Sequence, residues 1–409
     1  MTSPIDTACP HCDPSVAERN HVPEKIGIYV VAPVMSVLSP LHRTVTRFPT
    51  LKRMTEKAFF VPAFRFALLL KLLKETEIED TDSTIYNRTL VVVREAKKRG
   101  IRIRVVRLFG HATHHFSIEN KKGKRYFESL PLFSPQTVSP LDVDDKAKLK
   151  ELLLAAHMPC PKGRVFKDYD SALDYVHADV GFPVVVKPRC GSLSKHVSAD
   201  VRDSRALFDA IQIVRMISRE FIVEEHIPGK VHRVTVVEGQ VVASCWREPS
   251  NVVGDGTHTI RELITEKNQD IRRGAKQERN YTLHRIETGV KTITMLTSQQ
   301  MSLDTVPEEG KKIYLHDKVV LASGADIHDN TEDIHPENIR LFNDISRLCG
   351  VPLIGIDCIA DDLSVPYSQQ QFGVIEVNSH PYIDMHHVPS TGKERNVAGA
   401  ILDLYLAQQ

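Results

Sequence analysis

Short β-type runs alternate with helical segments along most of this chain. Leu90 to Gly100 is typical of a helix that ends at a glycine, and Ile101 to Val106 follows it as a strand. Farther on, the run that ends at Lys187 predicts a strand, Ser204 to Val214 a helix, and the apolar run from Phe221 another strand. This alternation favours an α/β chain, with α+β elements where strands and helices follow one another less regularly.

The length of 409 residues is too great for one compact core and predicts two or three domains. We expect a flexible leader over residues 1–24 and an N-terminal α/β domain over 25–140. A central part over 141–220 and a C-terminal part over 221–409 would then make up the rest of the chain. The helix expected at the start of the central part has acidic residues first and apolar residues at helical spacing after them.

The composition argues against several classes of protein. The 53 basic and 52 acidic residues leave a net charge of +1, whereas a nucleic-acid binder needs a surplus of Lys and Arg. Seven cysteines favour a reducing cytoplasm over a disulfide framework, and Cys9 with Cys12 is read as two thiols in a tail rather than a metal site. No apolar run reaches membrane-spanning length without a charge, so we expect no membrane partner.

Two apolar runs near the C-terminus are each interrupted by oxygen-bearing side chains. Glu376 and Asn378 lie two apart in a strand pattern and therefore share a face, while Val377 points the other way. Asp357 interrupts a second run, and pairing of the two runs would bring all three side chains together. Buried carboxylates need cations. Either a salt bridge to Arg or Lys or a Mg²⁺ ion, which prefers oxygen ligands, would serve.

Charged residues end two other predicted strands, and each of these positions allows two interpretations. Lys187 closes a Val-rich strand, where it is either an edge residue that blocks aggregation or a cation for phosphate. The polar turn Arg189 to Lys195 after it could close over phosphates with backbone donors. Glu224 and Glu225 precede a Pro-Gly turn, where they are solvated surface or receive the amino group of adenine, with the backbone of Ile227 beside the ring.

In chain order, five motifs resemble those of the ATP-grasp carboxylate–amine ligases. They are Asp145-Lys146, the strand end at Lys187, the run Val223 to Gly229, Gly355 to Asp357, and Ile375 to Asn378. The resemblance covers roughly residues 142 to 409, and it implies an ATP-grasp fold behind an N-terminal pre-grasp α/β domain. Three more segments, residues 251–274, 323–336 and 385–395, resemble the ATP-grasp domains of cyanophycin synthetase and of the bifunctional glutathione synthetase.

The resemblance implies a nucleotide and metal site. Two lysines would hold the phosphates of ATP, the Glu224 region would face adenine, and the oxygen-bearing side chains would bind two Mg²⁺ ions, with Mn²⁺ as an alternative. The candidate nucleotide ligands are Lys146, Lys187, Glu224, Glu225, Ile227 and Lys195, and the candidate metal ligands are Asp357, Glu376 and Asn378.

It also implies an acyl-transfer site. His232 and Arg233 match a pair that lines the acyl-phosphate site of the family, and with Lys187 they are the catalytic candidates. Two residues fall in the substrate loop of the family and three follow the metal strand. The substrate candidates are accordingly Ser323, Gly324, His386, His387 and Ser390.

The implied reaction forms an amide bond between amino acids or short peptides and releases ADP and phosphate. A carboxylate attacks the γ-phosphorus, and an amine then displaces phosphate from the acyl phosphate. We expect a stand-alone cytoplasmic ligase that forms a dimer or tetramer. Two alternatives stay open: a glutathione-synthetase-like ligase, and a nucleotide-binding pseudoenzyme. Ser194, His196 and His316 motivate the second, because they stand where the relatives carry glycine or arginine.

Overall fold

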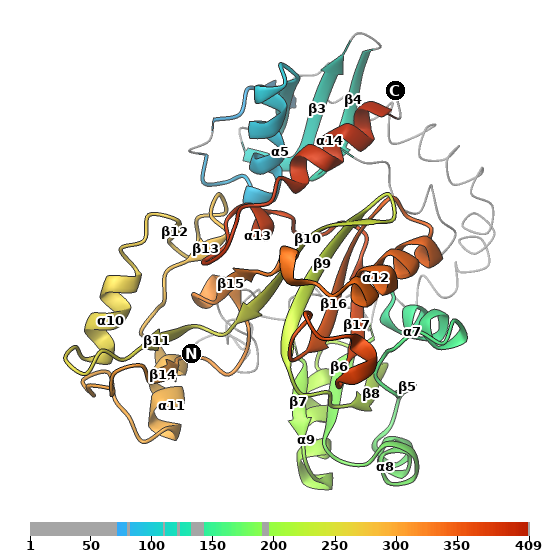
Figure 1. The fold of residues 1–409 in the computed structure, drawn as a ribbon, viewed down its shortest axis with the longest axis vertical. Coiled ribbons are helices and arrows are strands. Elements are labelled where there is room, and N and C mark those ends of the chain that lie inside the picture. Colours follow the sequence, from blue (N-terminus) through green and yellow to red (C-terminus); the bar gives the residue numbers. More distant parts are fainter. Residues whose placement is uncertain are drawn as a thin grey trace, which may run out of the picture.

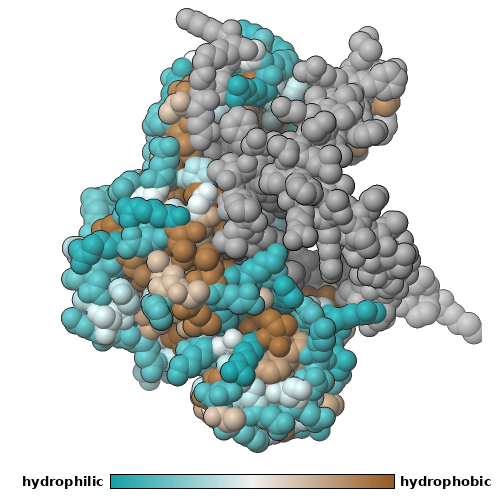
Figure 2. Space-filling model, turned by 90° about the vertical axis from the view of Figure 1, so that its right-hand side faces the viewer, coloured by the Kyte–Doolittle hydropathy of each residue, from teal (hydrophilic) through white to brown (hydrophobic). Residues whose placement is uncertain are grey.

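The computed structural model describes residues 72–79, 82–108, 111–120, 123–131, 143–189 and 196–407. The expected leader with Cys9 and Cys12, Ser194 and the candidate Lys195 lie outside the described residues. Within those ranges no helix is both long and apolar enough to span a lipid bilayer. On the face of the molecule in Figure 2, hydrophilic residues cover most of the described surface, and hydrophobic residues show mainly in its central part.

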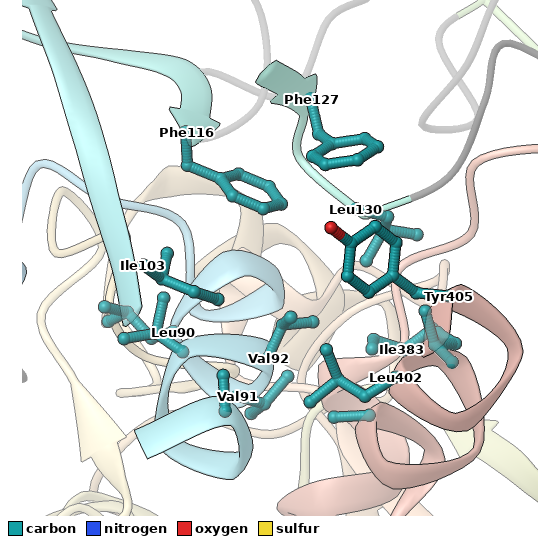
Figure 3. Packing of buried hydrophobic residues seen from close by; sticks show 14 of the residues in the cluster. Leu90, Val91, Val92, Ile103, Phe116, Phe127, Leu130, Ile383, Leu402 and Tyr405 are labelled. Atoms are coloured by element: carbon teal, nitrogen blue, oxygen red, sulfur yellow. The ribbon is translucent and has the colours of Figure 1, made fainter. Parts of the chain in front are cut away.

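The N-terminal unit is an antiparallel sheet with two helices packed on one face. Helix α14 lies beside α5 against this sheet, although the two helices are separated by most of the chain (Figure 1). Leu90, Phe116 and Tyr405 meet in the core between them (Figure 3). The strands follow the order β1 (Leu73–Thr76), β2 (Arg102–Leu108), β3 (His111–Asn120) and β4 (Gly123–Glu128), and the helices are α5 (Asn87–Lys98) and α14 (Val397–Ala407).

The helix and strand expected around Gly100 are confirmed with small shifts in their bounds. Helix α5 has Lys97 and Lys98 in its last turn, where cations interact favourably with the helix dipole. Gly100 follows with φ +69°, a backbone conformation that glycine adopts without strain. The chain can therefore turn sharply into β2.

A second sheet has four strands and two helices on one face. Val184, Val186, Phe221 and Val223 face these helices in one apolar cluster. The strands follow the order β5 (Gly163–Phe166), β8 (Phe221–Glu225), β6 (Val184–Pro188) and β7 (Ser198–Val201). The helices are α8 (Tyr169–Tyr175), extended by a π turn (Val176–Val180), and α9 (Ser204–Arg215). The expected boundary at residue 220 would separate β8 from this sheet, whereas β8 is hydrogen-bonded to both β5 and β6.

The third sheet is the five-stranded centre of the molecule (Figure 1). One face packs on α12 and α7 through residues such as Val234, Ile356 and Phe342. On the opposite face Val237 and Leu353 pack into the core of the N-terminal unit. The strands follow the order β15 (Asp326–Asp329), β10 (Gln240–Glu248), β9 (Lys230–Val237), β16 (Leu353–Ala360) and β17 (Gly373–Asn378), and the helices are α7 (Lys146–Ala155) and α12 (Pro336–Cys349).

An insertion between β10 and β15 forms its own small core around Ile260, Ile286 and Leu296. Helix α10 begins with a capping box, in which Thr259 and Glu262 each receive a backbone N–H of the other. The elements of this region are β11 (Asn251–Val253), α10 (Ile260–Lys267), β12 (Arg273–Gly274), β13 (Leu283–His284), α11 (Val290–Ser298) and β14 (Lys312–Tyr314). Short helices lie at Leu321–Ser323, Thr331–Asp333 and Tyr367–Gln369, and α13 spans Asp384–His387.

Candidate active site

The sheet made of β5, β8, β6 and β7 and the five-stranded sheet meet through residues on their polar faces. In the first of these sheets, the alternation that points Val184 and Val186 to the helices points Lys187 and Glu224 the other way. Lys187 Nζ reaches across to the carbonyl oxygen of Ile375 in β17, at 3.4 Å. The two sheets are therefore in contact where β6 and β17 carry their candidate residues.

Pairing of β16 with β17 confirms the expected meeting of the two interrupted runs. Asp357 lies directly opposite Glu376, and Asn378 lies opposite Gly355. Val377 is buried on the other face, as its place between Glu376 and Asn378 predicted. Since directly opposite residues share a face, the three oxygen-bearing side chains stand on one side of the sheet.

Asp357 is buried and bound by two arginines. Arg233 donates to both carboxylate oxygens, at 2.7 and 2.8 Å, and Arg247 Nη2 donates to one of them at 3.0 Å. Burial opposes ionisation of Asp357, but the positive charges of Arg233 and Arg247 hold its pKa below the usual range. Arg233 lies opposite Asp357 in β16, and Gly355, two residues earlier on the same face, leaves room for it, because a Cβ there would lie 3.2 Å from Nη1 of Arg233.

Glu376 and its strand meet two lysines. Lys146 Nζ lies 3.4 Å from Oε1 of Glu376. The β16–β17 ladder has a bulge at Ile375, because Asp357 pairs with Glu376 while the next residue, Cys358, pairs with Val374. A bulge leaves one residue out of the regular pairing, and here the carbonyl of that residue accepts the hydrogen bond from Lys187.

The donor set on this face suits a hard divalent cation. Asp357, Glu376 and Asn378 offer carboxylate and amide oxygens, the ligands that Mg²⁺ prefers. In the described part of the chain, no group of three or more His, Cys, Asp and Glu side chains is arranged to hold a metal. A Mg²⁺ ion here would therefore rely on two carboxylates and one amide, with remaining ligands from phosphate or water.

Helix α7 is fixed so that Lys146 begins it beside β17. The side chain of Asp145 caps the helix by accepting from the N–H groups of Ala147 and Lys148. Arg189, directly after β6, pairs with Asp145 at 3.0 Å. At the other sheet, Asp144 accepts hydrogen bonds from the N–H and hydroxyl of Ser379, at 3.0 and 2.6 Å. The start of α7 is thus tied to both sheets.

Glu224 is the centre of a buried ion group that includes an unexpected residue. Its Oε1 lies 2.5 Å from Lys187 Nζ, and its Oε2 lies 2.8 Å from Lys150 Nζ. Burial opposes ionisation of Glu224, but the two ammonium groups lower its pKa. Lys150 lies one turn after Lys146 on α7 and was not among the candidates. The spacing of four residues in the helix pattern was the signal that could have identified it.

The other expected adenine contacts lie next to this group. Glu225 accepts a hydrogen bond from the N–H of Lys162 at 2.9 Å. Ile227 packs over Gly373, where a Cβ would come within 2.4 Å of its Cδ1. At Gly163 a Cβ would lie 2.4 Å from the Cβ of Glu224, so glycine makes room for the buried carboxylate.

His232 and Arg233 are not brought together by the structure. They are neighbours in β9, so their side chains project to opposite faces. His232 contacts the carbonyl of Ala360 through Nε2 at 3.1 Å, whereas Arg233 binds Asp357. Only Arg233 joins the cluster on the face of Asp357.

The two histidines after the metal strand have structural partners. His386 is buried, and its Nε2 lies 2.8 Å from the hydroxyl of Thr235. His387 Nε2 accepts a hydrogen bond from the N–H of Ala398 at 3.1 Å, near the start of α14. Their contacts explain their positions, and a substrate role for them stays a prediction.

Two of the other substrate candidates, Gly324 and Ser390, connect to a second buried acid, Asp326. Ser390 donates to Asp326 at 3.0 Å, and Lys267 pairs with it at 2.6 Å. Arg273 also pairs with Asp326 and donates to the carbonyl of Gly324 at 3.2 Å. Ser323 ends a short helix, and Gly324 follows it with φ +88°. The structure thus groups Gly324 and Ser390 around one charge network.

Comparison with known proteins supports the ATP-grasp family independently of the geometry of the site. Residues 143–271 match the model of the RimK-like ATP-grasp domain. This chain carries an ATP-grasp domain. A cyanophycin synthetase from Trichormus variabilis is 34% identical over 341 residues, which cover 81% of this chain and 36% of that protein. The glutathione biosynthesis bifunctional protein GshAB of Clostridium perfringens is 28% identical over 319 residues, which cover 77% of this chain and 40% of that protein.

The ATP-grasp fold also has a solved counterpart. The crystal structure of a bifunctional glutathione synthetase from Pasteurella multocida matches with a TM-score of 0.62 and 23% identity. The match covers 80% of this chain and 45% of that one. The α/β fold with an ATP-grasp architecture is therefore confirmed. This ATP-grasp chain spans less than half the length of these relatives.

We expect the stability of the protein to fall between pH 7 and pH 5, because three histidines are held neutral. Burial lowers the pKa of His232 and His387 to about 4 and that of His386 to about 3. In the unfolded chain their pKa is about 6.5, so below that pH the unfolded state binds more protons. Each histidine should then remove up to about 1.4 kcal/mol of unfolding free energy per pH unit.

Urea denaturation at pH 7, 6 and 5 measures this loss. The variant His387→Gln keeps an acceptor for the N–H of Ala398 and should give a shallower dependence on pH than the wild type. A free energy of unfolding that stays constant from pH 7 to pH 5 would contradict the prediction.

Proposed function

We propose that this chain is an ATP-dependent carboxylate–amine ligase that forms an amide bond between amino acids or short peptides. The observation that carries the proposal is the meeting of two lysines with the oxygen-bearing face of β16 and β17. Lys146 lies beside Glu376 and Lys187 reaches the backbone of β17, where Asp357 stands opposite Glu376. The ATP-grasp domain and relatives that include synthetases support it.

The proposed chemistry follows from the charges of the side chains that meet at this site. A carboxylate substrate attacks the γ-phosphorus of ATP, ADP leaves, and an amine displaces phosphate from the resulting acyl phosphate. Lys146 and Lys187 bind phosphate oxygens, and the guanidinium of Arg233 stabilises negative charge near the acyl group. Mg²⁺ bound by Asp357, Glu376 and Asn378 would supply further neutralisation of phosphate charge. No covalent bond to the protein is needed, since positioning and electrostatics suffice.

The test is release of ADP by the purified protein with Mg-ATP and pairs of carboxylates and amines. We expect release that requires both partners, together with a product whose mass equals their sum less one water. Release with only γ-glutamylcysteine and glycine would select the glutathione-synthetase-like alternative. Tight binding of Mg-ATP without turnover by any pair would contradict the ligase and favour the nucleotide-binding pseudoenzyme.

The cellular setting and assembly belong to the same proposal. We expect a cytoplasmic enzyme that binds small molecules or peptides, not nucleic acid or membranes, and that forms a dimer or tetramer. Light scattering after size-exclusion chromatography measures the oligomeric state directly, and a monomer at micromolar concentration would contradict that part.

A further inference from the structure

We propose that Lys150 is a positioning residue of the nucleotide site, which holds Glu224 in place when Lys187 leaves it to bind phosphate. This inference rests on the proposed function, because it assumes that Lys187 serves the phosphates and Glu224 the adenine. It concerns a residue that none of the recognised motifs includes. Four observations carry it.

Lys150 is held in the interior by two acceptors. Its ammonium group pairs with Oε2 of Glu224 at 2.8 Å and donates to the carbonyl oxygen of Pro161. The side chain is only 10% exposed, whereas that of Lys148 on the same helix is 47% exposed. Since an ammonium group is costly to bury without partners, these contacts determine where Lys150 lies.

Two lysines share the single carboxylate of Glu224. Lys187 pairs with Oε1 at 2.5 Å while Lys150 pairs with Oε2. The three side chains together therefore carry one excess positive charge. Burial lowers the pKa of Lys187, and the nearby charge of Lys150 adds to that effect. The presence of Lys150 therefore weakens the hold of Glu224 on Lys187, because one negative charge is divided between two cations.

Lys187 already has a second acceptor within reach. Its Nζ also lies 3.4 Å from the carbonyl of Ile375, beside Glu376 and hence beside the proposed metal and phosphates. When Lys187 turns fully to that side, Glu224 would be a buried and unpaired charge without Lys150. With Lys150 present, Glu224 stays ionised and fixed as an acceptor for the amino group of adenine.

The backbone contact of Lys150 links it to the segment that packs beside Ile227. Pro161 packs near Gly373, where a Cβ would lie 3.0 Å from its ring and 2.4 Å from Ile227. The carbonyl of Pro161 is the one that Lys150 binds. Lys150 thus connects Glu224 with the segment that lies beside Ile227.

The experiment measures binding of Mg-ATP, Mg-GTP and adenosine to the full chain by calorimetry. The variant is Lys150→Met, and the control is Lys148→Met on the exposed side of α7. We expect Lys150→Met to weaken ATP by about tenfold or more and to reduce the preference for ATP over GTP. Adenosine should be weakened less, because Lys187 stays paired with Glu224 when no phosphate is bound. Lys148→Met should bind as the wild type does. Lys150→Arg, which keeps the charge, should recover part of the affinity.

Two further variants separate positioning from a structural role. Lys187→Met should weaken ATP but leave adenosine binding unchanged or tighter, because it removes the competitor for Glu224. In a Glu224→Gln background, Lys150→Met should have little further effect on ATP binding, since no charge is left to hold. An equal loss in that background, or binding by Lys150→Met equal to that by Lys148→Met, would overturn the inference.

The outcomes also distinguish this inference from the proposed function. If the wild type binds neither ATP nor adenosine, the ligase proposal fails together with this one. If it binds ATP and turns it over while Lys150→Met is unaffected, only the role of Lys150 fails. If Lys150→Met does not fold, Lys150→Arg in the Glu224→Gln background tests the same coupling, and a full loss of ATP affinity relative to Glu224→Gln alone overturns it.

Discussion

Replacing Glu376 by Gln should reduce substrate-dependent ADP release by at least about 100-fold. Gln has nearly the shape of Glu, so the strand should keep its packing, but the charge beside Lys146 and opposite Asp357 is lost. With one carboxylate in place of two, the site attracts Mg²⁺ less and neutralises phosphate charge less well. The activity of Glu376→Gln should therefore depend on a higher Mg²⁺ concentration than that of the wild type.

The measurement is a titration of ADP release with Mg²⁺ at saturating ATP. Glu151→Gln is the matched control, because Glu151 is exposed on α7 and lies outside the cluster. Activity of Glu376→Gln within about threefold of the wild type at low Mg²⁺ would show that Glu376 is no metal ligand.

Replacing Arg233 by Met should lower the free energy of unfolding by about 3–5 kcal/mol. Arg233 and Asp357 are both buried, and two hydrogen bonds join them. Without Arg233, the carboxylate keeps only the single hydrogen bond from Arg247. A buried charge with too few partners is costly, and this cost sets the size of the effect.

Urea denaturation compares this variant with Arg247→Met, which leaves both bonds from Arg233 intact and should lose only about 1–2 kcal/mol. The double variant Arg233→Met/Asp357→Asn should be more stable than Arg233→Met alone, since it removes the unpaired charge. Mg²⁺ should raise the stability of Arg233→Met more than that of the wild type, because the cation can replace the arginine. Equal losses in the two single variants would refute this account of Asp357.

The sequence predicted local elements and several of their polar positions well. The strand with Lys187 at its end, the helix after Ser204 and the pairing of Asp357 with Glu376 agree with the structure. These features depend on short-range rules: alternation in a strand, apolar spacing in a helix and glycine after a helix end. The ATP-grasp resemblance added the order of the motifs, and the match of residues 143–271 to an ATP-grasp domain model supports the family.

Features that depend on contacts between distant segments were missed. Lys150 lies in the helix predicted after Asp142 and was given no role, yet it pairs with Glu224 more than seventy positions away. The C-terminal helix α14 was assigned to the C-terminal part, whereas Leu402 and Tyr405 complete the core of the N-terminal unit (Figure 3). Which face of a helix meets which sheet follows from the topology, and no local pattern encodes it.

The sequence by itself determined which residues carry charge and how they alternate along each strand. It placed Glu376 and Asn378 on one face, because successive side chains in a strand point to opposite sides. The same rule separates His232 from Arg233, but only the paired strands show that the face of Arg233 is the one with Asp357. Tertiary structure decided which charges meet, because a buried carboxylate takes its partners from whatever elements the sheets bring against it.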